Sequence, residues 1–234
     1  MNVAIITAGG VGTRMKMSTP KQFYQVNGKP LILYTLEAFQ NSKHIDAITV
    51  VYLEGYFDFF MKMIKKYNLT KIKWLTPGGS TNQMSIFNGL KKIENEISPD
   101  DIIIVHDGIR PLITDDVIED SIKVCELYGN AVAVVPSNEA MLQSFDGMQS
   151  NMSIDRNTVW KTQTPHSMKF RDMLMLLNNT INKGIYNSVA VCTMLIENNF
   201  VVHFSKGNNN NFKITQPEDL ILFEAYLQSI KKDN

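Results

Sequence analysis

Short apolar runs alternate with longer amphipathic segments along this chain of 234 residues. The short runs are rich in Val and Ile and predict strands, whereas apolar residues at helical spacing predict helices. The expected strands are Asn2–Thr7, Ala47–Leu53, Ile72–Leu75, Asp101–Val105 and Ala131–Val135. The expected helices are Leu31–Asn41, Tyr56–Tyr67, Thr81–Ile93 and Asp115–Leu127. This alternation predicts an α/β fold, a Rossmann-like and mainly parallel sheet with helices on both faces.

One stretch, residues 137–163, interrupts the alternation. Two short extended segments there flank "FDGMQSN", whose Asp146-Gly147 pair is a hairpin signal. We therefore expect residues 1–234 to form a single domain, with 137–163 inserted as a protruding β-arm. Two helix starts also have the spacing of a capping box, Ser80 with Gln83 and Thr215 with Glu218.

Composition narrows the classes of partner. The 23 basic and 23 acidic residues cancel, so there is no overall positive field to attract nucleic acid. The apolar runs are far shorter than the ~20 residues that a membrane span needs. Cys125 and Cys192 have neither metal-ligand nor CxxC spacing, and Met1 leads directly into the first strand. We expect a cytoplasmic protein that binds neither nucleic acid nor membrane.

The loop after the first strand has the residues of an anion site. It reads "TAGGVGTRMKMSTPKQ", from Thr7 to Gln22, and ligands of doubly wound sheets bind beyond the carboxyl ends of the strands. Gly9, Gly10 and Gly12 let a ligand approach the backbone, and Arg14 and Lys21 supply two cations for phosphate oxygens. The spacing is not that of a P-loop, and Met15 replaces the third glycine of a dinucleotide fingerprint. The alternative is a tight turn with solvated charges.

Two further strand ends carry polar residues. In "VHDGIRP", Asp107 is suited to a sugar hydroxyl or a metal ion, and Arg110 to an ion pair that fixes the loop. His106 is more often a structural than a catalytic residue in such a position. "PGGSTNQMS", Pro77 to Ser85, offers backbone amides and hydroxyls suited to a base or ribose. Three strand ends therefore converge on one crevice.

These segments together resemble the polyol-phosphate cytidylyltransferases, the group that contains the methylerythritol phosphate and ribitol phosphate enzymes. The resemblance spans essentially the whole chain and follows the family's order: "AGGVGTRM", "PKQ", "GGSTNQMSI", "HDGIRP", "DRNTVWKTQTP" and "NFKITQPEDL". It implies a nucleotidyltransferase domain that transfers CMP from CTP to a small polyol phosphate and releases pyrophosphate. It also implies Mg²⁺ as cofactor and a homodimer formed through the β-arm.

The resemblance also assigns roles to single residues. It implies that Arg14, Lys21, Lys213 and Asp107 are catalytic, and that Asp107 also lies near the metal. The acceptor-binding residues would be Asp107, Arg156, Thr164 and Lys213, with Arg156 serving the neighbouring subunit. The CTP-binding residues would be Thr7, Ala8, Gly9, Gly10, Gly12, Gly79, Ser80 and Ser85.

Two departures from the family bear on the acceptor. Asn82 replaces an arginine of the cytidine loop, and Val189-Ala190 replace a Thr-Asp pair on the acceptor side. The second departure favours a sugar-alcohol phosphate such as ribitol or glycerol phosphate, destined for a surface polymer such as teichoic acid or capsule. Three alternatives stay open: the methylerythritol enzyme of isoprenoid synthesis, a sugar-1-phosphate nucleotidyltransferase with another base, and an inactive nucleotide-binding protein.

Overall fold

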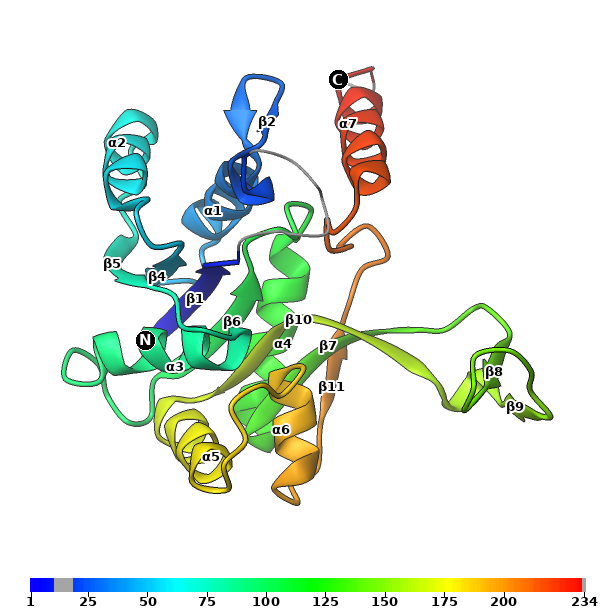
Figure 1. Ribbon diagram of the computed structural model, residues 1–234. Coiled ribbons are helices and arrows are strands. Elements are labelled where there is room, and N and C mark those ends of the chain that lie inside the picture. Colours follow the sequence, from blue (N-terminus) through cyan, green and yellow to red (C-terminus); the bar gives the residue numbers. More distant parts are fainter. Residues whose placement is uncertain (11–18, 233–234) are drawn as a thin grey trace.

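The computed structural model describes residues 1–10 and 19–232 (Figure 1). Its centre is a seven-stranded sheet in the order β11-β7-β10-β6-β1-β4-β5. The strands are β1 Asn2–Ala8, β4 Ala47–Tyr52, β5 Ile72–Pro77, β6 Ile102–Asp107, β7 Asn130–Pro136, β10 Trp160–Lys169 and β11 Phe204–Lys206. The five predicted strands are confirmed within a few residues at each end.

All neighbouring strands pair in parallel except β10, which runs antiparallel between β6 and β7. The predicted sheet did not include β10 or β11. The "KTQTPHS" stretch of β10 is polar and contains a proline, so it lacks the apolar signal of a buried strand. β11 has three residues, too few for a periodic pattern.

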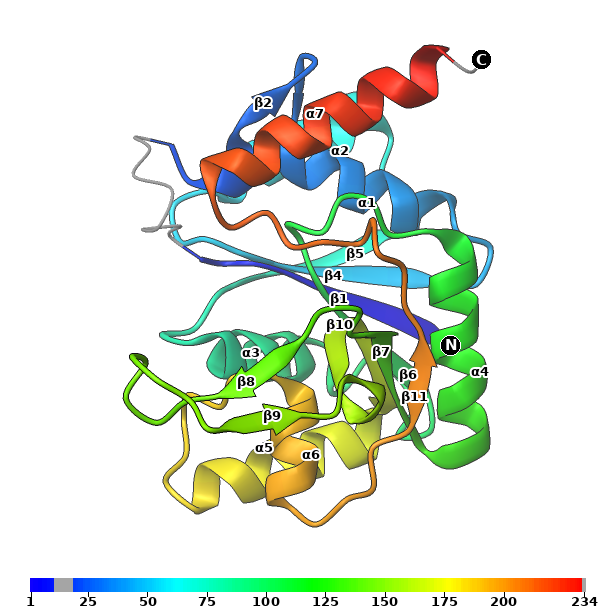
Figure 2. The same ribbon diagram turned by 90° about the vertical axis from the view of Figure 1, so that its right-hand side faces the viewer.

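Helices cover both faces of the sheet (Figure 2). One face is packed by α1 Leu31–Asn41, α2 Phe57–Tyr67 and α4 Asp115–Tyr128. The other is packed by α3 Asn82–Ile93, α5 Phe170–Asn182 and α6 Val191–Glu197. The C-terminal helix α7, Pro217–Lys232, packs beside α1 and the small β2–β3 ribbon, Gln25–Val26 and Lys29–Pro30. The α/β fold and the four predicted helices are confirmed.

The continuous apolar run of β1 follows from burial on two sides. Successive side chains of a strand point to opposite faces, so Val3 and Ile5 belong to the core under α3 and α5. Ala4 and Ile6 belong to the core under α1 and α4. Both faces therefore select apolar residues, and the run ends at Thr7 and Ala8, where the chain leaves the layers.

The β-arm leaves the body of the molecule at the ends of β7 and β10 (Figure 1). Its tip is an antiparallel pair, β8 Met141–Gln143 and β9 Met152–Ile154, and Gly147 takes a positive φ of 73° in the turn. The Asp146 carboxylate accepts from the N–H of Met148 at 2.9 Å, which stabilises that turn.

Both capping-box predictions were wrong by one residue. The N-cap of α3 is Thr81, whose hydroxyl accepts from the N–H of Met84 at 3.2 Å. At α7, the carboxylate of Asp219, and not that of Glu218, accepts from the N–H of Thr215 at 2.7 Å. Gln83 therefore takes no part in a capping box, and its side-chain amide binds the backbone of Ile185 and Ser188 instead.

Candidate active site

The predicted nucleotide residues line one cavity of about 570 Å³ at the carboxyl ends of β1, β4, β5 and β6. We call it the larger cavity. Seven of the eight predicted CTP-binding residues border it: Thr7, Ala8, Gly9, Gly10, Gly79, Ser80 and Ser85. Lys21, Asp107 and Lys213 border it too. Gly12 and Arg14 lie outside the described residues.

Glycines form this cavity because the chain segments approach too closely for side chains. A Cβ on Gly9 would lie 3.2 Å from the Cα of Gly78, so the two loops touch through their backbones. A Cβ on Gly79 would lie 2.5 Å from the Cβ of Met84 and 2.7 Å from its carbonyl carbon. The first turn of α3 leaves no room for any larger residue at position 79.

Two polar side chains brace these loops from inside. The Gln22 amide donates to the carbonyls of Ala8 at 2.9 Å and Gly10 at 2.8 Å, which fixes both ends of the described part of the glycine loop. The Ser85 hydroxyl accepts from the N–H of Gly79 at 3.0 Å and donates to the carbonyl of Thr81 at 2.9 Å. Ser85 thus shapes the loop after β5, a bracing role that its spacing in the sequence did not reveal.

Lys21 brings a cation to the larger cavity from a short 3₁₀ turn, Lys21–Phe23, that follows Pro20. Its side chain is largely buried, and it lines the cavity together with Gly9 and Gly10. Because charges interact more strongly where water is excluded, a buried ammonium acts more strongly on a bound phosphate than a solvated one.

A smaller cavity of about 170 Å³ adjoins the first. Thr7, Asp107 and Lys213 border both cavities, whereas Thr164 and Arg110 border only the smaller one. Part of its wall is apolar, and the residues of that part are Ile86, Val105, Val189, Ala190 and Val191. Three of the four predicted acceptor-binding residues therefore meet here.

Asp107 is the charged centre of the smaller cavity. Its two carboxylate oxygens accept separately, Oδ1 from Lys213 Nζ and Oδ2 from Arg110 Nε, each at 3.0 Å. Burial alone would raise the pKa of Asp107, but Lys213 and Arg110 outweigh it and hold the pKa well below its ordinary value. The ion pair predicted for Arg110 is confirmed. Arg110 also donates to the carbonyl of Asn211 at 2.7 Å, which ties the loop after β6 to the segment that carries Lys213.

His106 and Thr164 form a buried chain of hydrogen bonds behind Asp107. The N–H of Asp107 donates to Thr164 Oγ1 at 3.1 Å, and that oxygen lies 3.0 Å from His106 Nδ1. His106 Nε2 lies 3.2 Å from the carbonyl of Arg110. Burial is the main cause that lowers the pKa of His106 to about 3, so the ring is neutral.

His166 also lines the smaller cavity, and sequence reasoning missed it. It pairs with Val105 across the ladder, so it shares a sheet face with Val105 and Asp107. Its Nε2 is buried without a hydrogen-bond partner among the described residues, and burial above all lowers its pKa to about 4. The only available signal was its position two residues after Thr164.

The two departures noted in the sequence lie at this site. Asn82 and Val189 border both cavities. Gln83 holds the segment before Val189, since its amide donates to the carbonyl of Ile185 at 2.7 Å and accepts from the N–H of Ser188 at 2.8 Å. Val189, which is 86% exposed, therefore places an apolar side chain at the rim that the two cavities share.

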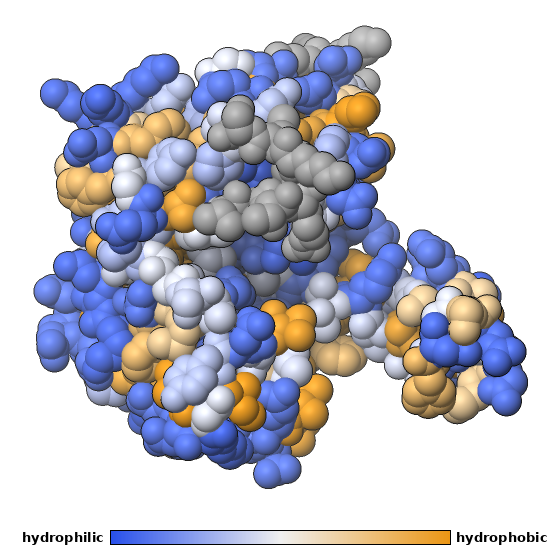
Figure 3. All heavy atoms as spheres, viewed as in Figure 1, coloured by the Kyte–Doolittle hydropathy of each residue, from blue (hydrophilic) through white to orange (hydrophobic). Residues whose placement is uncertain are grey.

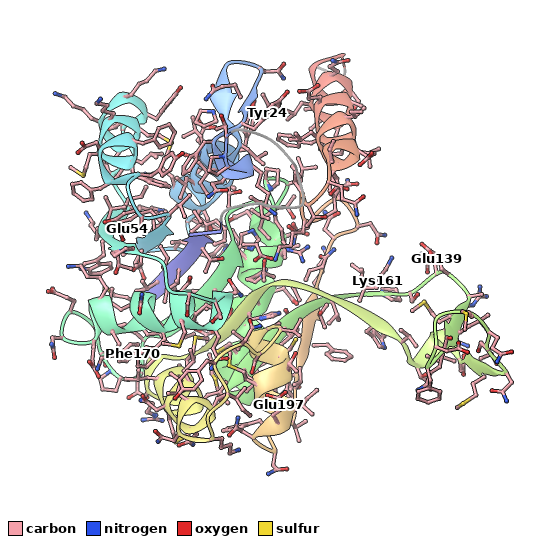
Figure 4. All side chains as sticks on the ribbon, in the orientation of Figure 1. Tyr24, Glu54, Glu139, Lys161, Phe170 and Glu197 are labelled. Atoms are coloured by element: carbon pink, nitrogen blue, oxygen red, sulfur yellow. The ribbon has the colours of Figure 1, made fainter. Side chains whose placement is uncertain are left out.

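Arg156 is set apart from the other predicted residues. It begins a 3₁₀ turn, Arg156–Thr158, on the arm and borders neither cavity of its own described chain. Glu139, on the segment between β7 and β8, lies out on the arm, whereas Lys161 lies at its base, where β10 pairs with Val135 of β7 (Figure 4).

Within residues 1–10 and 19–232, no three His, Cys, Asp or Glu side chains are grouped as a metal site would need. Asp107 is the one acidic residue among those named as bordering both cavities. In the same ranges, no helix has the length and apolar character to cross a membrane.

A mainly parallel sheet with glycine loops and cations at its carboxyl edge is the architecture of an α/β nucleotide-binding protein. The comparisons with known proteins are more specific. Residues 2–229 match the model of the family described as 2-C-methyl-D-erythritol 4-phosphate cytidylyltransferase. The chain belongs to this family, whose members are CTP-dependent cytidylyltransferases, and the expected family resemblance is confirmed.

Curated relatives with two different names resemble the chain. A ribitol-5-phosphate cytidylyltransferase of Lacticaseibacillus paracasei is 40% identical over 97% of this chain and 98% of its own. A 2-C-methyl-D-erythritol 4-phosphate cytidylyltransferase of Clostridium acetobutylicum is 37% identical over the same shares. The crystal structure of 4-diphosphocytidyl-2C-methyl-D-erythritol synthase from Anaerococcus prevotii has the same fold, with a TM-score of 0.82 at 24% identity over 97% of this chain and 98% of that one.

Proposed function

We propose that this enzyme transfers CMP from CTP to a small sugar-alcohol phosphate, with ribitol phosphate as the first candidate. The observation that carries the proposal is the shared border of the two cavities. The larger one has glycine loops and a buried lysine for a triphosphate, and the smaller one has Lys213, Arg110 and Asp107 for a second substrate that is both anionic and hydroxylated.

The proposed reaction needs no general base. A phosphate monoester has a second pKa of about 6 and is already an anion at neutral pH. An acceptor phosphate oxygen forms a bond to the α-phosphorus of CTP, the bond to the β-phosphate oxygen breaks, and its electron pair leaves with pyrophosphate. Lys21 on one side and Lys213 on the other hold the two anions together and stabilise the charge that develops on the phosphoryl oxygens.

We propose Mg²⁺ as the cofactor of this reaction. Mg²⁺ keeps several waters and binds through one or two carboxylates plus substrate phosphates, which fits a site with a single shared carboxylate. Asp107 is the residue placed to hold it, and both of its oxygens already accept from cations, so the triphosphate would supply most of the other ligands. When bound, the ion would neutralise charge on the phosphates.

The acceptor is proposed from two observations. Five relatives with 37–40% identity are named ribitol-5-phosphate cytidylyltransferases. Val189 and Ala190 give the acceptor side an apolar wall in place of the Thr-Asp pair of the methylerythritol enzymes. The Clostridium relatives named for methylerythritol phosphate, at 34–37% identity, keep that acceptor as the second candidate.

Pyrophosphate release tests the proposal. The purified enzyme is assayed with CTP, UTP or GTP against ribitol 5-phosphate, glycerol 3-phosphate, 2-C-methyl-D-erythritol 4-phosphate and a sugar 1-phosphate. We expect CTP with ribitol 5-phosphate to give the highest kcat/KM. A preference for UTP or GTP with a sugar 1-phosphate would contradict the proposal. If no combination of nucleotide and acceptor released pyrophosphate, the result would indicate the inactive nucleotide-binding protein.

We further propose that the β-arm docks on a second copy of the chain, so that Arg156 serves the partner's smaller cavity. A lone two-stranded hairpin is marginally stable, and this one exposes large apolar side chains on the arm (Figure 3). Leu142 is 69% exposed, Phe145 87% and Met148 86%. Docking on a second copy would bury these apolar side chains, and each subunit would supply its Arg156 to the smaller cavity of the other.

Mixing inactive variants tests this arrangement. If Arg156 acts across the interface, Arg156→Ala mixed with Lys21→Ala forms heterodimers in which one site is intact, and about a quarter of the wild-type activity returns. Each variant alone stays weakly active. No recovery in subunits shown to exchange, or a monomer in sedimentation at micromolar concentration, would contradict the proposal.

A further inference from the structure

The hydrogen bonds behind the smaller cavity fix both protons of the His106–Thr164 pair. His106 is fully buried, and its two ring nitrogens face a carbonyl and a hydroxyl, so one ring nitrogen donates and the other accepts. The Arg110 carbonyl, 3.2 Å from Nε2, can only accept, and therefore Nε2 carries the proton. Nδ1 then has a lone pair facing Thr164.

Thr164 completes the chain because its oxygen already accepts from the N–H of Asp107 at 3.1 Å. Its hydroxyl proton is free to donate to His106 Nδ1 at 3.0 Å. The side chain is thus held in one orientation by two bonds, one to the backbone of the cavity's central acid and one to a buried imidazole.

His106 itself does not reach either cavity. Side chains alternate along β6, so His106 points to the face opposite Asp107, where its ring contacts that of Phe39 at 5.0 Å between centroids. It borders neither cavity in the described part of the chain. Any effect on the reaction must therefore pass through Thr164 and the turn from Asp107 to Arg110.

We propose that His106 is a positioning residue for the acceptor substrate, acting through the Thr164 hydroxyl. It fixes the side chain of Thr164, a residue that borders the smaller cavity, and, through the Arg110 carbonyl, keeps the turn that places Asp107 and Arg110. The proposal rests on the proposed function, since it assigns the smaller cavity to the phosphorylated acceptor.

Two amide variants separate the two bonds of His106. His106→Asn places its amide near the position of Nδ1 and retains an acceptor for the Thr164 hydroxyl. His106→Gln places its amide near Nε2, so it retains a donor to the Arg110 carbonyl and loses the acceptor for Thr164. We expect His106→Gln to raise KM for the acceptor about tenfold, the effect of one lost hydrogen bond. KM for CTP should change less than about twofold, and His106→Asn should recover most of the loss.

The Thr164→Val background decides whether the effect passes through Thr164. Residues that act through one another are non-additive, so His106→Gln should add little to the acceptor KM of Thr164→Val. A purely structural role would lower thermal stability and turnover together, with equal effects on both substrates. Equal effects of the Asn and Gln variants, or full additivity with Thr164→Val, would overturn the proposal.

A spectroscopic readout keeps this inference separate from the proposed function. The ¹⁵N chemical shifts of the His106 ring report which nitrogen carries the proton, whatever the acceptor. We expect Nε2–H and an unprotonated Nδ1, and a protonated Nδ1 would overturn the positioning role even in an active enzyme. If the wild type transfers CMP to no acceptor, the proposed function fails and with it the assigned substrate.

Discussion

The two cavities that meet at Asp107 are built in different ways. The larger cavity takes its shape mainly from the backbone and small residues of two loops, each directly after a strand of the sheet, with Lys21, Asp107 and Lys213 as charged residues on its border. The smaller one is formed by long and apolar side chains from β6, β10, α3, the segment before α6 and the segment at Lys213. Close backbone packing gives the first its shape, and side-chain pairing gives the second its chemistry. We therefore expect substitutions in the first to act on geometry and those in the second on charge and specificity.

The strongest test of this contrast is Lys21→Ala, because Lys21 is a largely buried cation beside the glycine loop of the larger cavity. We expect turnover to fall about 10²- to 10³-fold, the effect of removing one preorganised donor, with the fold retained. Steady-state kinetics and circular dichroism measure the two quantities. Lys91→Ala, which removes an exposed lysine of α3 paired with Glu94, is the matched control and should stay near wild type. Near-normal turnover of Lys21→Ala would refute the assignment.

Arg14→Ala is expected to lose turnover in the same way, as the glycine-loop sequence predicts. This residue lies outside the described ranges, so the expectation rests on the motif alone. Unchanged kcat with CTP would remove Arg14 from the proposed machinery.

Gly79→Ala tests whether backbone packing sets the larger cavity. The new Cβ would overlap the first turn of α3 at Met84, so we expect a loss of about 1–3 kcal/mol in the free energy of unfolding. KM for CTP should rise while KM for the acceptor changes less. Gly10→Ala is the stability control, since its Cβ would meet no atom of residues 1–10 and 19–232 within 4 Å. Equal unfolding midpoints for the two variants would show that the approach at Gly79 is not limiting.

Acid should affect the region of the smaller cavity first, because two buried neutral histidines lie there. The folded-state pKa values are about 3 for His106 and about 4 for His166, below the unfolded value of about 6.5. Their contribution to stability is therefore complete above pH ~6.5 and is lost as the pH falls toward these folded values. Within that window, each histidine lowers the free energy of unfolding by about 1.4 kcal/mol for every pH unit of acidification.

His166→Gln provides the measurement. Urea unfolding of the wild type and the variant between pH 7 and pH 4.5 should show a smaller acid slope in the variant, by up to about 1.4 kcal/mol per pH unit. Identical slopes would mean that His166 titrates alike in the folded and unfolded states.

Local patterns in the chain were sufficient for the larger cavity and for most of the fold. Strands β1, β4, β5, β6 and β7 can be predicted from their continuous apolar runs, because a strand covered by helices on both faces is apolar at successive positions. The glycine loops after β1 and β5 are each a contiguous stretch of sequence. For that reason seven of the predicted nucleotide residues appear together in one cavity. The capping predictions failed because several Ser, Thr and acidic residues compete within one turn, and backbone geometry selects among them.

The sequence by itself therefore determined the layers, the edge of the sheet that holds the site and the cations available to it. The tertiary structure alone decided that β10 enters the sheet antiparallel beside β6, which brings Thr164 and His166 next to Asp107. It also decided that Asp107 is paired on both oxygens, by Arg110 three residues away and by Lys213 from the far end of the chain. The physical reason is range: periodicity reports which side of an element is buried, whereas a pairing between distant segments depends on the packing of the whole core.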